Sequence, residues 1–166
     1  MHFDLKPISR ESIPEALSKA ERYRLINEPD LAESICLDVL AIAPDHQQAL
    51  VMLLLARTDQ FGAGASPESA REVLRRLSGE YERAYYAGIV WERVAHVQRH
   101  SAAFGSNSTA YHAFREAMSF YEKAEKVRPA GNDDAILRWN TCARTMMRDE
   151  KIRPLPLDEV QPILSE

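Results

Sequence analysis

A spacing of 34 residues recurs along the first two thirds of this chain. Ala20, Leu54 and Gly88 lie 34 residues apart, each inside a segment whose apolar residues recur at helical spacing. Repetition at a fixed period of about 20–50 residues is typical of stacked units, each of which buries its apolar face only against its neighbours. No segment alternates polar and apolar residues convincingly. The period therefore predicts an all-α stack of helical pairs.

Helix breakers divide the chain into about seven predicted helices. The predicted ranges are 11–26, 31–43, 46–60, 67–77, 80–102, 109–127 and 134–148. Asp30, Ser66 and Ser108 are expected to be N-caps, because their short side chains can accept hydrogen bonds from the free backbone N–H groups of the first turn. The fifth and sixth helices are the longest, which predicts an elongated hairpin.

The predicted helices form one domain over residues 11–149, preceded by an N-terminal arm over residues 1–10. Residues 150–166 contain Pro154, Pro156 and Pro162, which favour an irregular tail. The tail is also aliphatic, so we expect it to cap the last helix, because the end of a helical stack otherwise exposes an apolar edge. Occupation of a groove in its own or a neighbouring molecule, and disorder, are the alternatives.

Two segments carry small, aromatic or apolar, small and proline residues in the same order and at the same spacing. They are Ala117, Tyr121, Ala124 and Pro129, and Ala32, Cys36, Val39 and Pro44. In the first helices, Ala20 precedes Tyr23 by three residues and Gly88 precedes Trp91 by three. Over residues 11–149 the chain therefore resembles the tetratricopeptide repeat (TPR) family. The resemblance implies an α-α superhelix, a TPR-like solenoid whose concave face binds a partner rather than catalysing a reaction.

In the TPR family, the first helix of each pair lines the concave face. The residues that the resemblance places there are Met52, Leu55, Tyr85, Tyr86, Ile89, Arg93, Trp139, Asn140 and Met146. Aromatic residues and methionine are enriched at protein interfaces, so we expect an adaptor that binds a protein or peptide segment. Leu17 and Glu21 occupy the positions where chaperone-binding members grip a carboxylate, which disfavours chaperone tails. The alternative is that the apolar members of this set are core residues.

A second candidate site lies on the elongated hairpin. It consists of His96, His100, His112 and Glu116, and residues four apart share one face of a helix. If the two helices are antiparallel, three imidazoles and one carboxylate could complete a tetrahedral zinc site. A metal-binding helical protein or enzyme is therefore one alternative function. The other interpretation of these side chains is a solvated helix face, in which case no cofactor is expected.

Composition disfavours several other classes of protein. The net charge is −4, and we find no basic stripe of the kind that nucleic acids require. The longest aliphatic run, residues 49–56, is too short to span a bilayer, and the N-terminus has no apolar leader. We therefore expect a cytoplasmic protein without nucleic-acid or membrane partners, in which Cys36 and Cys142 are packed thiols.

No catalytic motif accompanies these features. We find no glycine-rich phosphate loop, no H-E-x-x-H and no nucleophile elbow, so we do not expect an enzyme. A third alternative is a self-associating structural protein, in which the elongated hairpin or the tail pairs with a second copy to form a homo-oligomer.

Overall fold

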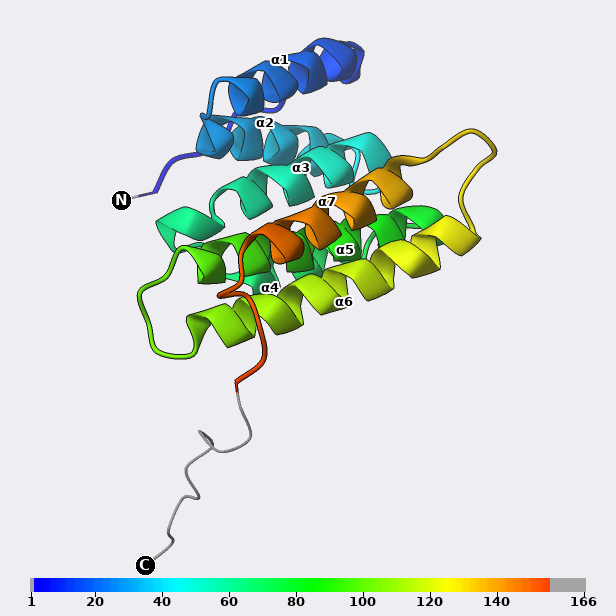
Figure 1. Ribbon diagram of the computed structural model, residues 1–166. Coiled ribbons are helices and arrows are strands. Elements are labelled where there is room, and N and C mark those ends of the chain that lie inside the picture. Colours follow the sequence, from blue (N-terminus) through cyan, green and yellow to red (C-terminus); the bar gives the residue numbers. More distant parts are fainter. Residues whose placement is uncertain (1, 156–166) are drawn as a thin grey trace, which may run out of the picture.

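The computed structural model describes residues 2–155, and within them all regular structure is helical (Figure 1). Seven α-helices lie in this range. They are α1 (Ile13–Leu25), α2 (Pro29–Ile42), α3 (Gln47–Asp59), α4 (Pro67–Leu74), α5 (Glu80–Arg99), α6 (Ser106–Lys126) and α7 (Asp134–Arg148). Two short 3-10 helices, Arg10–Ser12 and Phe61–Ala63, precede α1 and follow α3. The all-α prediction is confirmed for the described residues.

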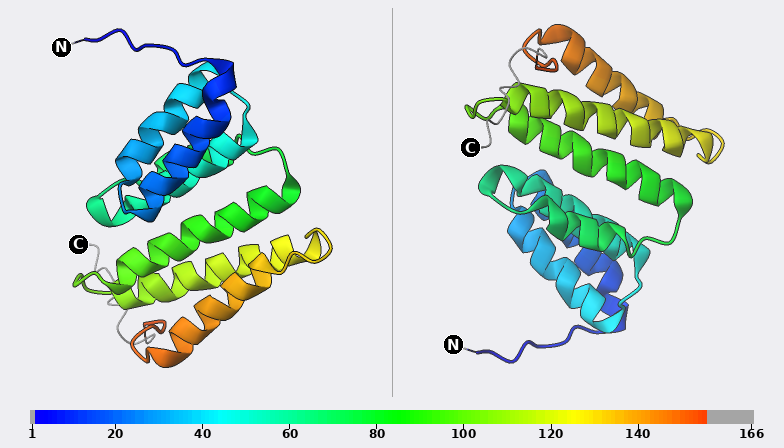
Figure 2. Two further views of the ribbon diagram at one scale, coloured as in Figure 1. Left: turned by 90° about the horizontal axis from the view of Figure 1, so that it is seen from above. Right: turned by 90° about the horizontal axis from the view of Figure 1, so that it is seen from below.

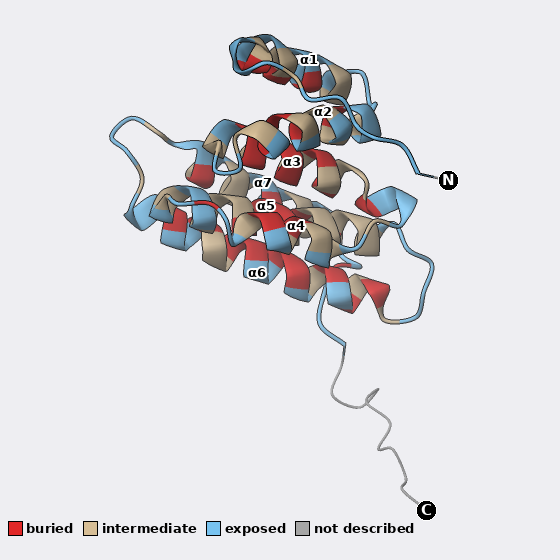
Figure 3. Cartoon of the chain, turned by 180° about the vertical axis from the view of Figure 1, so that it is seen from behind, coloured by how far each residue is buried: buried red, intermediate tan, exposed pale blue. Residues whose placement is uncertain are grey.

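The helices pack in the order of the sequence. Each helix contacts the helix before it and the helix after it in the sequence. In addition, α3 contacts both α1 and α5. The views from above and below in Figure 2 show α1–α4 at one end of an elongated stack and α5–α7 at the other. Buried residues follow the facing sides of successive helices (Figure 3). Since no helix has to pair with a partner distant in sequence, local spacing suffices to predict the order of packing.

The core has two parts, which meet between α3 and α5. One part is built mainly from α1–α4, and the other from α5–α7 together with Ile152. Leu55, Tyr86 and Val94 are partly buried and pack against both parts. These three side chains therefore connect the two halves of the stack.

The elongated hairpin of α5 and α6 is confirmed, with 20 and 21 residues respectively. Their close approach depends on Gly88, because a Cβ atom at this position would overlap the ring of Tyr121. Tyr121 is fully buried. A glycine and an aromatic residue thus fit one another where the two helices cross, as expected for close-packed helices.

Helix starts confirm one predicted N-cap and correct two. Ser66 Oγ accepts a hydrogen bond from the N–H of Glu68, and Pro67 begins α4. The prediction of Asp30 as an N-cap is wrong, because α2 already begins at Pro29. Proline suits the first position of a helix, where a backbone N–H would have no partner within the helix. Ser108 is also wrong: α6 begins at Ser106, and Ser108 Oγ instead accepts the N–H of Leu155.

The segment after α7 returns to the hairpin. Ile152 is buried against the α5–α7 core, and Leu155 reaches the first turn of α6. The start of the predicted tail thus packs against the α5–α7 part of the core, while residues 156–166, on which the rest of the predicted cap depends, lie outside the described residues. No helix within residues 2–155 is both long and apolar enough to cross a bilayer.

Candidate ligand-binding cleft

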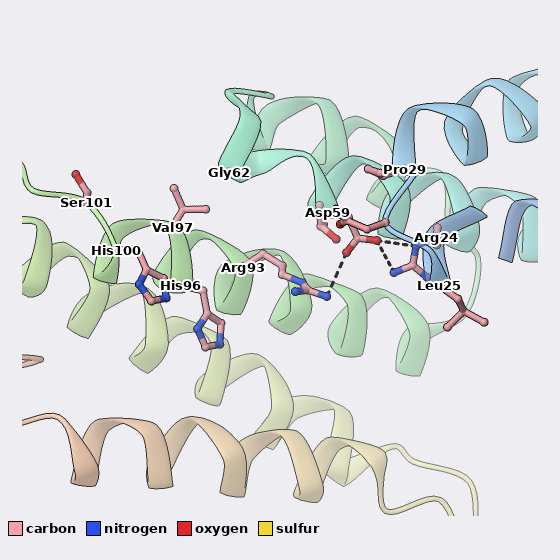
Figure 4. A pocket seen from close by; sticks show the side chains of 12 residues that line it. Arg24, Leu25, Pro29, Asp59, Gly62, Arg93, His96, Val97, His100 and Ser101 are labelled. Atoms are coloured by element: carbon pink, nitrogen blue, oxygen red, sulfur yellow. Dashed lines mark hydrogen bonds and ion pairs between the residues drawn. The ribbon is translucent and has the colours of Figure 1, made fainter. Parts of the chain in front are cut away.

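A cleft of about 720 Å³ opens on the side of the stack where α1, α3 and α5 succeed one another. Its walls are the turn between α1 and α2, the C-terminal end of α3 and the C-terminal half of α5 (Figure 4). Leu25, Pro29 and Val97 supply apolar surface, and Arg24, Asp59 and Arg93 supply charge. The cleft thus spans both parts of the core and combines apolar and ionic contacts, as ligand sites commonly do.

Asp59 is the centre of the charged part of the cleft. Its Oδ2 accepts a hydrogen bond from Arg24 Nε at 2.8 Å and also lies 2.7 Å from Arg24 Nη2. Its other oxygen, Oδ1, lies 3.2 Å from Arg93 Nη2. The side chains of Arg24 and Asp59 are 19% and 18% exposed, whereas that of Arg93 is 39% exposed. Two guanidinium groups share one carboxylate, so this group of three carries one excess positive charge.

One face of α5 forms the longest wall of the cleft. Arg93, His96, Val97 and His100 recur at intervals of three and four residues and all line it. The ring of His96 also meets the ring of Phe114 edge-on, with centroids 5.2 Å apart. Its Nε2 lies 3.8 Å from Glu92 Oε1. His96 therefore lies between the open cleft and the interior of the α5–α7 half.

Behind His96, Glu92 is the centre of a buried polar network. Tyr121 Oη donates to its Oε2 at 2.5 Å, and Arg138 Nη1 donates to its Oε1 at 3.1 Å. Burial alone would raise the pKa of Glu92, but the nearby imidazole of His96, the hydrogen bond from Tyr121 and the charge of Arg138 outweigh it, so that the pKa is lowered. The same burial and the carboxylate of Glu92 raise the pKa of Tyr121. Glu92 is thus held ionised, and Tyr121 neutral.

Among the residues expected to line a concave groove, only Arg93 lines this cleft. Ile89 is buried in the core and cannot meet a partner, which corrects its assignment. Leu55 and Tyr86 are partly buried between the two core parts, and Met52 packs on the α1–α4 part. The remaining members of the set, Tyr85, Trp139, Asn140 and Met146, are all intermediate in exposure.

The aromatic residues of the predicted groove are partly exposed and also contact other side chains. The ring of Tyr85 stacks on Tyr81 at 5.6 Å and meets Tyr86 edge-on at 5.2 Å, both on α5 itself, and it lies 5.9 Å from Tyr121 of α6. Trp139 Nε1 donates to Glu122 of α6 at 3.0 Å. Stacked and edge-on arrangements of aromatic rings are favourable, so these contacts help to orient the rings.

The structure does not assemble the zinc site expected on the hairpin. Within residues 2–155 no group of three or more histidine, cysteine, aspartate or glutamate side chains is placed to hold a metal ion. His96 and His100 lie on the cleft wall, whereas His112 and Glu116 are exposed on α6. The reason is helical phase: α6 turns Ala113, Phe114 and Ala117 inward, which leaves His112 and Glu116 on its outer side.

The sequence analysis missed Arg24 and Asp59, although a signal for them exists. Arg24 precedes Asp59 by 35 residues, and Asp59 precedes Arg93 by 34. The second interval equals the 34-residue period of Ala20, Leu54 and Gly88, and the first exceeds it by one residue. The period, read for charged as well as apolar residues, therefore brings Asp59 of α3 and Arg93 of α5 to equivalent positions and Arg24 of α1 to within one residue of the same position.

Comparison with known proteins adds no relative: no family model matches the chain, and no curated protein or solved structure does. The function therefore has to be inferred from the cleft and the packing around it.

Proposed function

We propose that the chain is a non-catalytic protein–protein interaction module of the TPR-like type, which binds a peptide segment in the cleft between α1, α3 and α5. The observation that carries this proposal is the position of the cleft, which lies across three successive first helices of the stack. In a superhelix built from such pairs, first helices form the concave side, and extended concave surfaces suit peptide binding.

The chemistry of the cleft also favours recognition over catalysis. Its strongest charges are the guanidinium groups of Arg24 and Arg93, whose planar sets of N–H donors suit the recognition of anions such as carboxylates. Leu25 is 80% exposed at its rim. An apolar side chain so exposed, next to oriented charges, provides the mixed contact surface of a transient interface.

Selection from a random peptide display library on the full chain tests this function. Peptides of about ten residues are long enough to cross the cleft when extended. We expect recovered peptides to bind the wild type and to bind Leu25→Asp about tenfold more weakly, because an apolar contact is replaced by a charge.

Leu137→Asp is the matched control, since Leu137 is 61% exposed on α7 and does not line the cleft. Failure to recover any binding peptide contradicts the proposed function. Equal binding by Leu25→Asp and Leu137→Asp would place the peptide elsewhere on the molecule.

A further inference from the structure

We infer that the partner is an acidic segment in an extended conformation, and that one of its carboxylates binds the guanidinium group of Arg93. This inference rests on the proposed peptide-binding function and specifies its ligand. The argument starts from the charge of the cleft, where Arg24 and Arg93 share the single carboxylate of Asp59. One positive charge therefore has no counterpart in this group of three.

Arg93 is the member of the group that can accept a ligand. Arg24 holds Asp59 through both Nε and Nη2, and both side chains are mostly buried. Arg93 meets Asp59 through Nη2 alone and is twice as exposed. A guanidinium group has five N–H donors in a planar fork, so donors of Arg93 are left for a second carboxylate, which the fork can bind in bidentate fashion.

Asp59 acts as a positioning residue for Arg93. Because Arg24 fixes one of its oxygens, the other oxygen holds the Arg93 guanidinium at a defined place over the cleft (Figure 4). A side chain oriented in advance loses less rotamer entropy when the ligand binds. The ion pair therefore prepares Arg93 for a ligand while neutralising only part of the local charge.

The remaining wall indicates an extended ligand with apolar side chains. From Arg93 to His100, α5 rises about 10 Å, which corresponds to about three residues of extended chain. His96 and His100 supply imidazole groups along this path, and Val97 lies between them. Leu25 lies at the other end of the cleft from Val97, with Arg93 between them (Figure 4). A segment with an acidic residue at Arg93 and aliphatic residues on both sides of it, one near Val97 and one near Leu25, complements these contacts.

The test uses fluorescence anisotropy with the full chain and peptides recovered from the display library. For each peptide, a matched version carries Asn and Gln in place of Asp and Glu. We expect acidic residues to be enriched among the recovered peptides, and the amide versions to bind about tenfold more weakly, as for loss of one charge-assisted hydrogen-bonded pair.

Variants of the chain locate the carboxylate. Arg93→Gln should weaken the acidic peptide about tenfold and leave the amide version unchanged, and Arg93→Lys should restore binding only in part because it lacks the fork. Arg144→Gln is the control, since Arg144 is exposed on α7 outside the cleft.

Three results would overturn the inference. Equal affinity for acidic and amide peptides, with binding still sensitive to Leu25→Asp, would reject the acidic ligand and leave the peptide-binding function intact. Equal affinity of Arg93→Gln and Arg144→Gln for acidic peptides would reject Arg93 as the anchor. Recovery of no peptide at all would reject the inference and the proposed function together.

Discussion

Asp59 Oδ1 lies 3.2 Å from Arg93 Nη2, and the two residues are separated by the same 34 positions that separate Leu54 from Gly88. The ion pair therefore joins positions of α3 and α5 that lie one period apart. Arg24 extends it to the preceding helix by bonding the other oxygen of Asp59. A period that organises the apolar contacts of the stack thus also aligns a row of charged side chains along one side of it.

Gly88→Ala should destabilise the fold by about 1–3 kcal/mol, the usual range for overpacking. The added methyl group overlaps the buried ring of Tyr121, and neither α5 nor α6 can move without disturbing the core around them. Urea unfolding followed by circular dichroism measures the change. Gly62→Ala is the control, because nothing lies within 4 Å of a Cβ atom there; equal effects of the two substitutions would contradict the close crossing at Gly88.

Glu92→Ala should cost about 3–5 kcal/mol of unfolding free energy, because it leaves the charge of Arg138 and the hydroxyl of Tyr121 without their partner. Tyr121→Phe, which removes a single hydrogen bond, should cost about 1–2 kcal/mol. The double variant should cost less than the sum of the two, since both remove the same contact. Additive losses would show that the two groups do not interact.

The stability of the fold should fall as the pH falls below about 4.5, the ordinary pKa of glutamate. The pKa of Glu92 is lowered in the folded chain, so the unfolded chain binds the proton more tightly and acid favours unfolding. Urea midpoints measured at a series of acidic pH values test this. Glu92→Gln has no carboxyl group to titrate and should show a shallower decline, relative to its own value at neutral pH.

Stability should also fall as the pH rises above about 9. Burial raises the pKa of Cys36 and of Cys142 from 9.0 to about 12, so these thiols ionise readily only in the unfolded chain. The raised folded pKa means that their contribution is complete below pH 9 and is lost as the pH approaches 12. A Cys36→Ala/Cys142→Ala variant should lose less stability between neutral and alkaline pH than the wild type does.

Ile152→Ala should lower the unfolding free energy by about 2 kcal/mol, because this side chain is buried against the α5–α7 core. Lys151→Ala, at the exposed neighbouring position, should change it by less than about 0.5 kcal/mol. Thermal unfolding of both variants shows whether the segment after α7 stabilises the fold through the contacts of Ile152. Equal melting temperatures would contradict that stabilising role.

The sequence predicted those features of the fold that depend on local chemistry. Apolar spacing identified the seven helices, and Ser66 with Pro67 marked the start of α4. The predicted N-caps Asp30 and Ser108 are wrong because helix starts also depend on neighbouring residues. Pro29 begins α2 one residue before Asp30, and Ser108 Oγ accepts a hydrogen bond from the N–H of Leu155, 47 residues later.

The site was less predictable than the fold, because the direction of each side chain depends on how its helix is rotated against others. Tyr85 contacts three other tyrosines and is partly exposed, so its place in a partner-binding groove stays a prediction. Ile89, one turn further along α5, is buried. Of the residues predicted for the groove, only Arg93 lines the cleft, beside His96 and His100 from the predicted metal site. Arg24 and Asp59, the ion-pair partners of Arg93, belong to neither predicted set.

The two-part core gives the cleft a mechanical consequence. Arg24 and Asp59 belong to the half built from α1–α4, whereas Arg93 and Val97 belong to α5, which begins the other half. A molecule bound in the cleft would contact both halves on either side of the joint at Leu55 and Tyr86, and it would therefore resist bending of the stack there.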